Sequence, residues 1–410
     1  MAFARRVVML SLLWVGLFSP RAVEAQMTGH DMMTSGGGWR FMQDGTVFLE
    51  FNHQGSDRGG QEFVAPNWWM GMASRETGRG VVILNGMFSL DSATVGREGY
   101  RQLFQSGEAL DGQPLVDRQH PHDLFMQLSA SWRIPVNAST GLTLAGGPSG
   151  EPALGPIAFM HRASAGDNPT APLSHHKLDS THVSFGVVSA ALDHGKFTVE
   201  GSVFNGREPD DNRWDFDFGK LDSFSGRVWF RPAAGWELQA SSGRLVEPEE
   251  LEPGNLVRST ASLSWTRTGG SNVTGFTAAY GRNDAEHGAE QALLVEGARQ
   301  GGSRAFYTRF ETSRIESGVV TALTGGGVWN VLQAFGVEGG LGADVTWHRT
   351  PEDAREDYGA HPVSFHVFFR LRPHLPSGRM WNMRMTSPTM PMADPHAGHQ
   401  MGASSNRVIE

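Results

Sequence analysis

Short stretches in which apolar and polar residues alternate recur along the chain and predict β-strands. In residues 363–373, Val363, Phe365 and Val367 lie on one face, while the other face carries Ser, His and Arg side chains. Residues 123–134 and 257–267 repeat this alternation. A period of two is typical of a strand with one apolar and one polar face. Each stretch is about ten residues long, the length that a tilted strand needs to cross a bilayer.

Short and long connections alternate between these stretches. Short turns are expected at 75–80, 192–196, 231–235, 267–272 and 299–303, and long polar loops at 91–121, 148–180, 206–221, 247–256, 283–289 and 349–362. This asymmetry is typical of outer-membrane barrels, which have short periplasmic turns and long external loops. It predicts an all-β protein, a closed antiparallel transmembrane β-barrel of about 16 strands, within a range of roughly 14 to 18. A soluble β-sandwich would share the alternation but would not explain the loop pattern.

The polar faces of the predicted strands carry many charges, and this supports a wet interior. They are Glu50, Glu200, Arg227, Arg231, Arg258, Arg309, Glu311, Asp344, Arg370 and Arg372. Burying so many charges in a dry core would be costly, whereas lining a wet lumen with them is not. The strand patterns are weakest at 137–147, where Gly and Pro are frequent, and at 314–336.

The two ends of the chain differ from the predicted barrel. Residues 1–25 combine Arg5 and Arg6, an apolar run and a small-residue end, the pattern of a cleaved secretory signal peptide. We therefore divide the chain into a signal peptide (1–25), a flexible Met/His-rich segment (26–38), a β-barrel (39–373) and a flexible Met/His-rich tail (374–410). An even strand number would place both ends in the periplasm, with the barrel in the cell outer membrane and in contact with its lipid.

The composition of the chain excludes some kinds of site and makes some partners improbable. The chain has no cysteine, which excludes disulfides and thiolate metal sites. Its net charge of −9 argues against a nucleic-acid partner.

Histidine and aspartate gather before two predicted strands, in "RQHPHDLF" (118–125) and "LSHHKLDSTH" (173–182). With His161 from the loop between them, the candidate metal ligands of this external rim are His120, His122, Asp123, His161, His175, His176, Asp179 and His182. Imidazole and carboxylate ligands together suit Zn, Cu(II) or Ni. The alternatives are that these side chains serve only as hydrogen-bonding groups of the loops, or that they act in catalysis. The loop 148–180 is long enough to fold inward as a constriction or lid.

Methionine and histidine are concentrated in both tails. The candidate ligands there are Met27, His30, Met32, Met33, Met380, Met383, Met385, Met390, Met392, His396, His399 and Met401. Thioethers are soft ligands that select Cu(I), and imidazole extends the range to Cu(II). Copper ions are therefore the expected cofactor or cargo, with a periplasmic metal carrier as a candidate partner. Compositional drift in a disordered tail is the alternative explanation.

Several longer motifs resemble those of a known family. "DRQHPHDLFMQLSASW", "GPSGEPALGPIAFMHRASA", "LDSTHVSFGVV", "FNGREPD" and "HPVSFHVFFRLRP" are similar to a family of uncharacterised bacterial exported, outer-membrane β-barrel-like proteins. The resemblance covers nearly the whole mature chain and implies an architecture, since that family has no assigned chemistry. The tails also resemble, in composition only, the Met/His-rich segments of copper-resistance outer-membrane barrels.

These observations lead to one main functional hypothesis and two alternatives. The main hypothesis is an outer-membrane barrel for the passage or sequestration of soft metal ions, foremost copper, without enzymatic activity. The first alternative is a porin-like channel for small polar solutes, with the loop 148–180 as its constriction. The second is an outer-membrane enzyme that uses the His/Asp rim.

Overall fold

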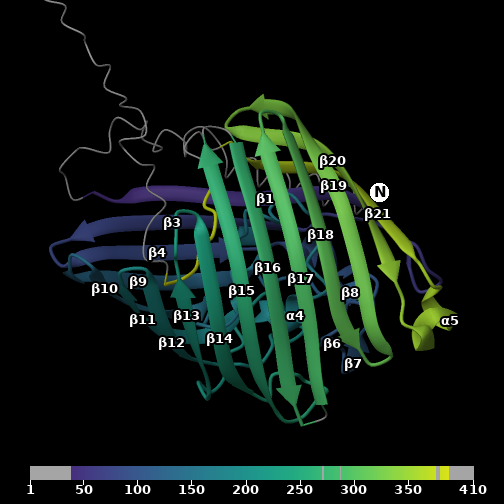
Figure 1. The fold of residues 1–410 in the computed structure, drawn as a ribbon, viewed down its shortest axis with the longest axis horizontal. Coiled ribbons are helices and arrows are strands. Elements are labelled where there is room, and N and C mark those ends of the chain that lie inside the picture. Colours follow the sequence, from purple (N-terminus) through teal and green to yellow (C-terminus); the bar gives the residue numbers. More distant parts are fainter. Residues whose placement is uncertain (1–37, 270–271, 287, 375–378, 387–410) are drawn as a thin grey trace, which may run out of the picture.

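The protein folds into a closed antiparallel β-barrel (Figure 1). The computed structural model describes residues 38–269, 272–286, 288–374 and 379–386. The main sheet has 17 strands, of which the short β2 (Gly60–Val64) only extends the wall, leaving 16 that form it. These are β1 (Arg40–Gln54), β3 (Asn67–Thr77), β4 (Gly80–Phe88), β9 (Phe125–Asn137), β10 (Thr140–Gly150), β11 (Ser184–His194), β12 (Phe197–Phe204), β13 (Ser223–Phe230), β14 (Trp236–Val246), β15 (Asn255–Gly269), β16 (Asn272–Ala285), β17 (Gly288–Gly301), β18 (Arg304–Ile315), β19 (Gly318–Ala334), β20 (Val337–Arg349) and β21 (Val363–Pro373). The predicted fold class and strand number are confirmed.

Pairing between the first and last strands closes the barrel. In this pair Val47 lies opposite Leu371 and His53 lies opposite Phe365. Along the other side of β1, residues 40–47 pair with β3 and residues 50–54 pair with β2. Closure leaves the wall without a free strand edge, so the backbone N–H and C=O groups of the strands are paired within the sheet.

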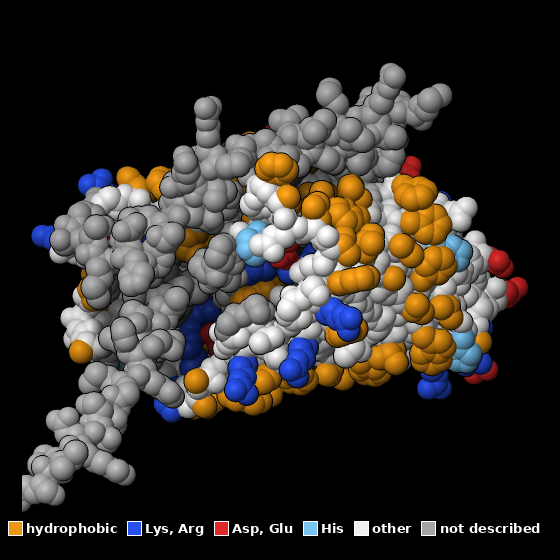
Figure 2. Space-filling model, turned by 90° about the horizontal axis from the view of Figure 1, so that it is seen from above, with side chains coloured by type: hydrophobic (Ala, Val, Ile, Leu, Met, Phe, Trp, Pro, Cys, Tyr) orange, Lys and Arg blue, Asp and Glu red, His pale blue; other side chains and the backbone are white. Residues whose placement is uncertain are grey.

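The wall has its apolar face outside and its polar face inside. In β21 the exposed side chains are Val363, Phe365 and Val367, whereas His366 and Arg370 are buried. Further exposed apolar residues on the outer wall include Leu144, Val188, Val199, Val203, Phe224, Val257, Phe306, Leu323, Leu341 and Val345. Figure 2 shows this apolar cover on the outside and charged side chains in the hollow of the barrel. The arrangement is the reverse of that in a water-soluble protein.

The connections at the two ends of the barrel differ as predicted, with one error. At one end the turns are short, for example 78–79, 138–139 and 195–196. The N-terminal end of β1 and the C-terminal end of β21 lie at this same end of the barrel. At the other end the connections 89–124, 151–183, 205–222 and 350–362 are long. The predicted long loop at 283–289 is wrong, because β16 continues to Ala285 and β17 begins at Gly288. The weak patterns at 137–147 and 314–336 belong to β10 and β19.

Two long connections carry local structure. Residues 89–124 contain α3 (Asp91–Thr94) and two small hairpins, β5 (Tyr100–Arg101) with β8 (Arg118–Gln119), and β6 (Glu108–Leu110) with β7 (Gln113–Leu115). Residues 151–183 contain the short helices η2 (Phe159–His161), α4 (His175–Leu178) and η3 (Ser180–His182). No helix among the described residues is long and apolar enough to cross a membrane. The predicted signal peptide and most of the two tails lie outside the described residues.

Candidate functional site in the barrel interior

The connection 151–183 folds into the barrel, and we call it the internal loop. All residues from 151 to 179 are buried. Its helix α4 contacts β16 and β17, and lies behind these strands in Figure 1. The prediction that this region folds inward agrees with the structure. Because the loop has little regular structure, its polar groups need partners on the barrel wall.

Arg162 is the main electrostatic link between the internal loop and the wall. Its Nε lies 2.6 Å from Glu296 of β17, and its Nη1 lies 2.7 Å from Asp179. The same Nη1 donates to the carbonyl oxygen of Ile157 at 2.9 Å. Glu296 is shared with Arg309 of β18, at 3.2 Å. All four charged groups are buried, so each depends on the others for compensation.

Further polar contacts hold the internal loop along its length. Asp167 pairs with Arg370 and Arg372 of β21. The Ser174 hydroxyl donates to Glu311 of β18 at 3.1 Å. At the start of the loop, Arg227 of β13 lies 2.8 Å from Glu151. Additional hydrogen bonds join Ala153 to Ser202, Gly155 to Ser241, Ser164 to Thr277 and Ser180 to Arg258. The charges predicted to line a wet lumen therefore meet a polar loop inside the barrel.

Part of the predicted C-terminal tail also lies in the lumen. Arg379 pairs with Asp44 of β1 at 3.1 Å, and Arg384 contacts Glu200 of β12 at 3.3 Å. Met380, Met383 and Met385, predicted as metal ligands in a flexible tail, are buried in apolar clusters. Met380 and Met383 pack with Trp68, Met70, Met72, Met87, Met126, Phe159 and Met160. The reason is that this part of the lumen wall is itself apolar and is covered by the returning chain.

A second group of residues, the histidine cluster, lies where the internal loop meets the connection 89–124. It consists of His120, His122, His175, His176 and His182. The ring centroids of His175 and His182 are 5.2 Å apart, and those of His122 and His182 are 5.6 Å apart. The ring centroids of His120 and His176 are 5.4 Å apart. The sequence thus identified five histidines that the fold brings together, although they come from segments more than fifty residues apart in the chain.

The remaining predicted ligands occupy other places. Asp179 contacts both His175 and Arg162, and so links the histidine cluster to Arg162. Asp123 lies 3.3 Å from Arg213. His161 packs edge-on against Trp68, at 5.2 Å between ring centroids. The side chains predicted for an external rim lie next to the starts of β9 and β11, at the end of the barrel with the long connections, and are largely buried there. The tail candidates Met27, His30, Met32, Met33, Met390, Met392, His396, His399 and Met401 lie outside the described residues.

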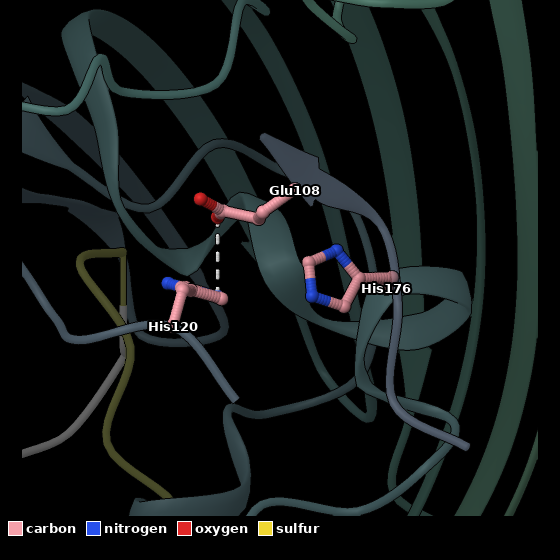
Figure 3. A group of neighbouring side chains, drawn as sticks. All are labelled: Glu108, His120 and His176. Carbon is pink, nitrogen blue, oxygen red and sulfur yellow. Dashed lines mark ion pairs between the residues drawn. The ribbon is translucent and has the colours of Figure 1, made fainter. Parts of the chain in front are cut away.

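Glu108 is a member of the site that the sequence did not reveal. It lies on β6, and its carboxylate is 3.1 Å from Nε2 of His120 (Figure 3). Glu108, His120 and His176 each offer one potential ligand atom, and these atoms lie within 4.8 Å of one another. Arg213 also contacts Glu108 and links it to Asp123. A cavity of about 30 Å³ opens beside Glu108, His120, His122 and His182.

Burial sets the protonation states of the cluster. It lowers the pKa of His176 to about 4, although Glu108 opposes the shift. Burial also lowers the pKa of His120, of His175 and of His182, and the neighbouring imidazoles contribute in the same direction. Burial opposes ionisation of Asp179, but the Arg162 guanidinium and the hydrogen bond from His175 outweigh it and hold the pKa of this carboxyl well below its usual range. At neutral pH these four imidazoles are therefore uncharged beside an ionised Asp179.

The structure is similar in fold to solved structures of outer-membrane barrel proteins. Pseudomonas putida OprB is similar with a TM-score of 0.52 and 8% identity, over 82% of this chain and 94% of that one. Salmonella typhi OmpF, in a complex with daunomycin, is similar with a TM-score of 0.50 and 8% identity, over 82% of this chain and 98% of that one. No protein-family model matches the chain, and no curated protein matches it in sequence.

The fold and these similarities define the class of the protein. It is a closed 16-stranded antiparallel β-barrel, a fold that it shares with outer-membrane barrel proteins. At 8% identity the similarity is one of fold. The particular features of this chain are the buried internal loop, the returning segment 379–386 and the histidine cluster.

The Arg162 contacts predict a large stability difference. We expect Arg162→Ala to lower the free energy of unfolding by about 3–5 kcal/mol, because it leaves Glu296 and Asp179 buried with less compensation. The matched control is Arg282→Ala, which removes an exposed contact with Asp284 on the outside of the same wall and should have little effect. Urea unfolding of both variants in lipid vesicles measures the difference. Equal stability of the two variants would contradict the role assigned to Arg162.

The environment of His161 predicts a pH dependence. Burial lowers its pKa from 6.5 to about 4; Asp44 opposes this shift and Arg379 adds to it. The unfolded chain therefore takes up this proton first as the pH falls, so stability should decrease between pH 6.5 and 4. The difference between the two values corresponds to about 3 kcal/mol.

Replacing the group tests this prediction. We expect His161→Asn to flatten the dependence of unfolding free energy on pH in that window. His194→Asn, at the exposed last residue of β11, is the control and should keep the slope of the wild type. A slope that is unchanged in His161→Asn would show that other groups cause the dependence.

Proposed function

We propose that the protein resides in the outer membrane and mediates restricted passage of small polar solutes or ions. The observation that carries the proposal is the inverted polarity of the barrel, with apolar side chains outside and charged side chains facing the lumen. The wall thus suits lipid on one side and water or polar cargo on the other. The porin-like architecture supports this hypothesis, which was the first alternative from the sequence.

The internal loop would control this passage. It lies across the lumen, with residues 151–179 buried, and it is held by ion pairs to β17 and β21 and by hydrogen bonds to several other strands. Cargo larger than the cavities beside it requires the loop to move. The polar contacts between the loop and the wall can exchange with water once the lumen is hydrated. We therefore expect low conductance in the closed arrangement and higher conductance when the loop is displaced.

A reversible cross-link tests the role of the loop. The hydroxyl oxygens of Ser164 on the loop and Thr277 on β16 are 2.7 Å apart. The chain has no cysteine, so Ser164→Cys with Thr277→Cys introduces the only thiol pair. In proteoliposomes we expect oxidation to reduce flux of small sugars and ions to that of empty vesicles, and a reductant to restore the wild-type rate.

A second cross-link provides the control. The hydroxyl oxygens of Ser242 and Ser259 are 3.0 Å apart on the outer side of β14 and β15. A disulfide between cysteines at these two positions would join wall strands without touching the loop, and flux should be insensitive to its oxidation. If both cross-linked proteins conduct equally in the oxidised state, the loop does not control passage. If the wild type conducts nothing, the proposed function itself fails.

Copper passage, the main hypothesis from the sequence, stays a prediction and has one structural observation in its favour. A cavity of about 20 Å³ is lined by Met70, Met87, Met126, Met383, His161 and His182, among other residues. Thioether and imidazole groups together are suitable ligands for Cu(I).

Isosteric substitutions test the copper hypothesis. We expect Met126→Leu with Met383→Leu to lower the amount of Cu(I) bound by the purified protein, because Leu keeps the volume but lacks the sulfur. Met385→Leu is the control, since Met385 is buried in another cluster. Unchanged Cu(I) stoichiometry in the double variant would exclude this cavity as a copper site. The prediction that the protein is not an enzyme, and the alternative of a hydrolase using His120 or His182, remain untested.

A further inference from the structure

The histidine cluster has an unusual hydrogen-bonding pattern. Nδ1 of His122 lies 2.8 Å from a carboxylate oxygen of Asp91, and Nδ1 of His175 lies 2.8 Å from a carboxylate oxygen of Asp179. Nδ1 of His182 lies 2.8 Å from the carbonyl oxygen of Asp179. Ionised carboxylates and carbonyls only accept hydrogen bonds. Each of these Nδ1 atoms therefore carries the hydrogen of the bond.

The other nitrogen of each ring has no such partner. The Nε2 atoms of His122, His175 and His182 are buried and have no hydrogen-bond partner among the described residues. Three buried polar atoms without partners carry a desolvation cost. Proteins use the same pattern, with one ring nitrogen fixed by an oxygen and the other left free, to prepare histidine as a metal ligand.

His120 also has a ring nitrogen without a hydrogen-bond partner, although its surroundings differ. Its Nδ1 faces the carbonyl oxygen of Pro121 at 3.2 Å, while its Nε2 faces a Glu108 carboxylate oxygen at 3.1 Å without forming a hydrogen bond. A cation held between Nε2 and the Glu108 carboxylate would give this buried nitrogen a partner.

We propose that the histidine cluster and Glu108 form a binding site for a divalent transition-metal ion inside the barrel. The three groups whose potential ligand atoms lie within 4.8 Å of one another come from two connections, Glu108 and His120 from residues 89–124 and His176 from residues 151–183. The rings of His122, His175 and His182 surround them. A bound ion therefore joins the internal loop to the neighbouring connection and fixes both. Neutral imidazoles with a carboxylate suit Zn²⁺, Cu²⁺ and Ni²⁺ rather than Mg²⁺ or Ca²⁺, which prefer oxygen ligands. The inference is independent of solute passage, since a site of this kind can bind metal in a barrel that conducts nothing.

The experiment must separate this site from the histidines of the two tails. The starting protein is the full chain with His30, His396 and His399 replaced by Gln, purified in detergent. We expect it to bind Zn²⁺ saturably in calorimetry, and Co²⁺ with the visible absorption of a nitrogen-coordinated ion. Adding His120→Gln and His176→Gln, one ligand from each connection, should weaken Zn²⁺ binding at least tenfold and remove the Co²⁺ absorption, because the chelating set is broken. Mg²⁺ should not compete.

Two controls keep the outcome interpretable. In the same background, His194→Gln with His361→Gln replaces two exposed histidines outside the cluster and should leave the affinity unchanged. If the His120/His176 variant does not fold, as judged by circular dichroism, the single substitution Glu108→Gln takes its place, with the same expected loss. Absence of saturable Zn²⁺ binding in the starting protein, or equal affinity in the cluster and control variants, would overturn the proposal.

Discussion

The structure depends on one constraint, which is that the backbone groups of each strand are paired within a closed sheet. Pairing β1 with β21 removes the free edges, and this allows the outer surface to be covered by apolar side chains. Closure has a second consequence. Successive side chains of a strand point to opposite faces of the sheet, so every second side chain of a closed sheet points into the enclosed lumen. The inward residues of this chain include Glu50, Arg258, Glu296 and Arg370. Their charges must be compensated inside the barrel, by water or by the chain itself.

The internal loop provides much of this compensation. Arg162 faces Glu296, and Asp167 faces Arg370 and Arg372, so the loop presents a charge opposite to that of the wall at each contact. Its composition also suits burial without regular structure. Pro152, Pro156, Pro169 and Pro172 have no N–H group, which reduces the number of backbone donors that need a partner. A segment rich in Pro and Gly, which reads as a surface loop, is thus able to fill a polar interior.

Local pattern predicted the wall well and the interior poorly, for a physical reason. The period of two in residues 363–373 depends only on which side of the sheet each residue faces, and β21 follows it closely. Where a loop goes depends on contacts between distant segments, which no local pattern encodes. Glu108 illustrates this, since it belongs to the site through the fold of β6 and has no neighbouring histidine in the sequence. Met380 and Met383 gave a clear compositional signal, but the fold places them in an apolar cluster that the sequence alone could not locate.

The position of the histidine cluster follows from the same compensation of charge. Two loops that enter one lumen must meet, and where they meet the nearest groups are the polar side chains of the strand entrances. Asp179 shows how the roles combine, because it accepts from Arg162, which is bound to the wall, and from His175, which belongs to the cluster. The contact that holds the loop in the barrel therefore also fixes the orientation of an imidazole. Side chains held in this way lose little conformational freedom on binding a ligand, so the cost of assembling a site falls on the folding of the barrel and not on the binding step.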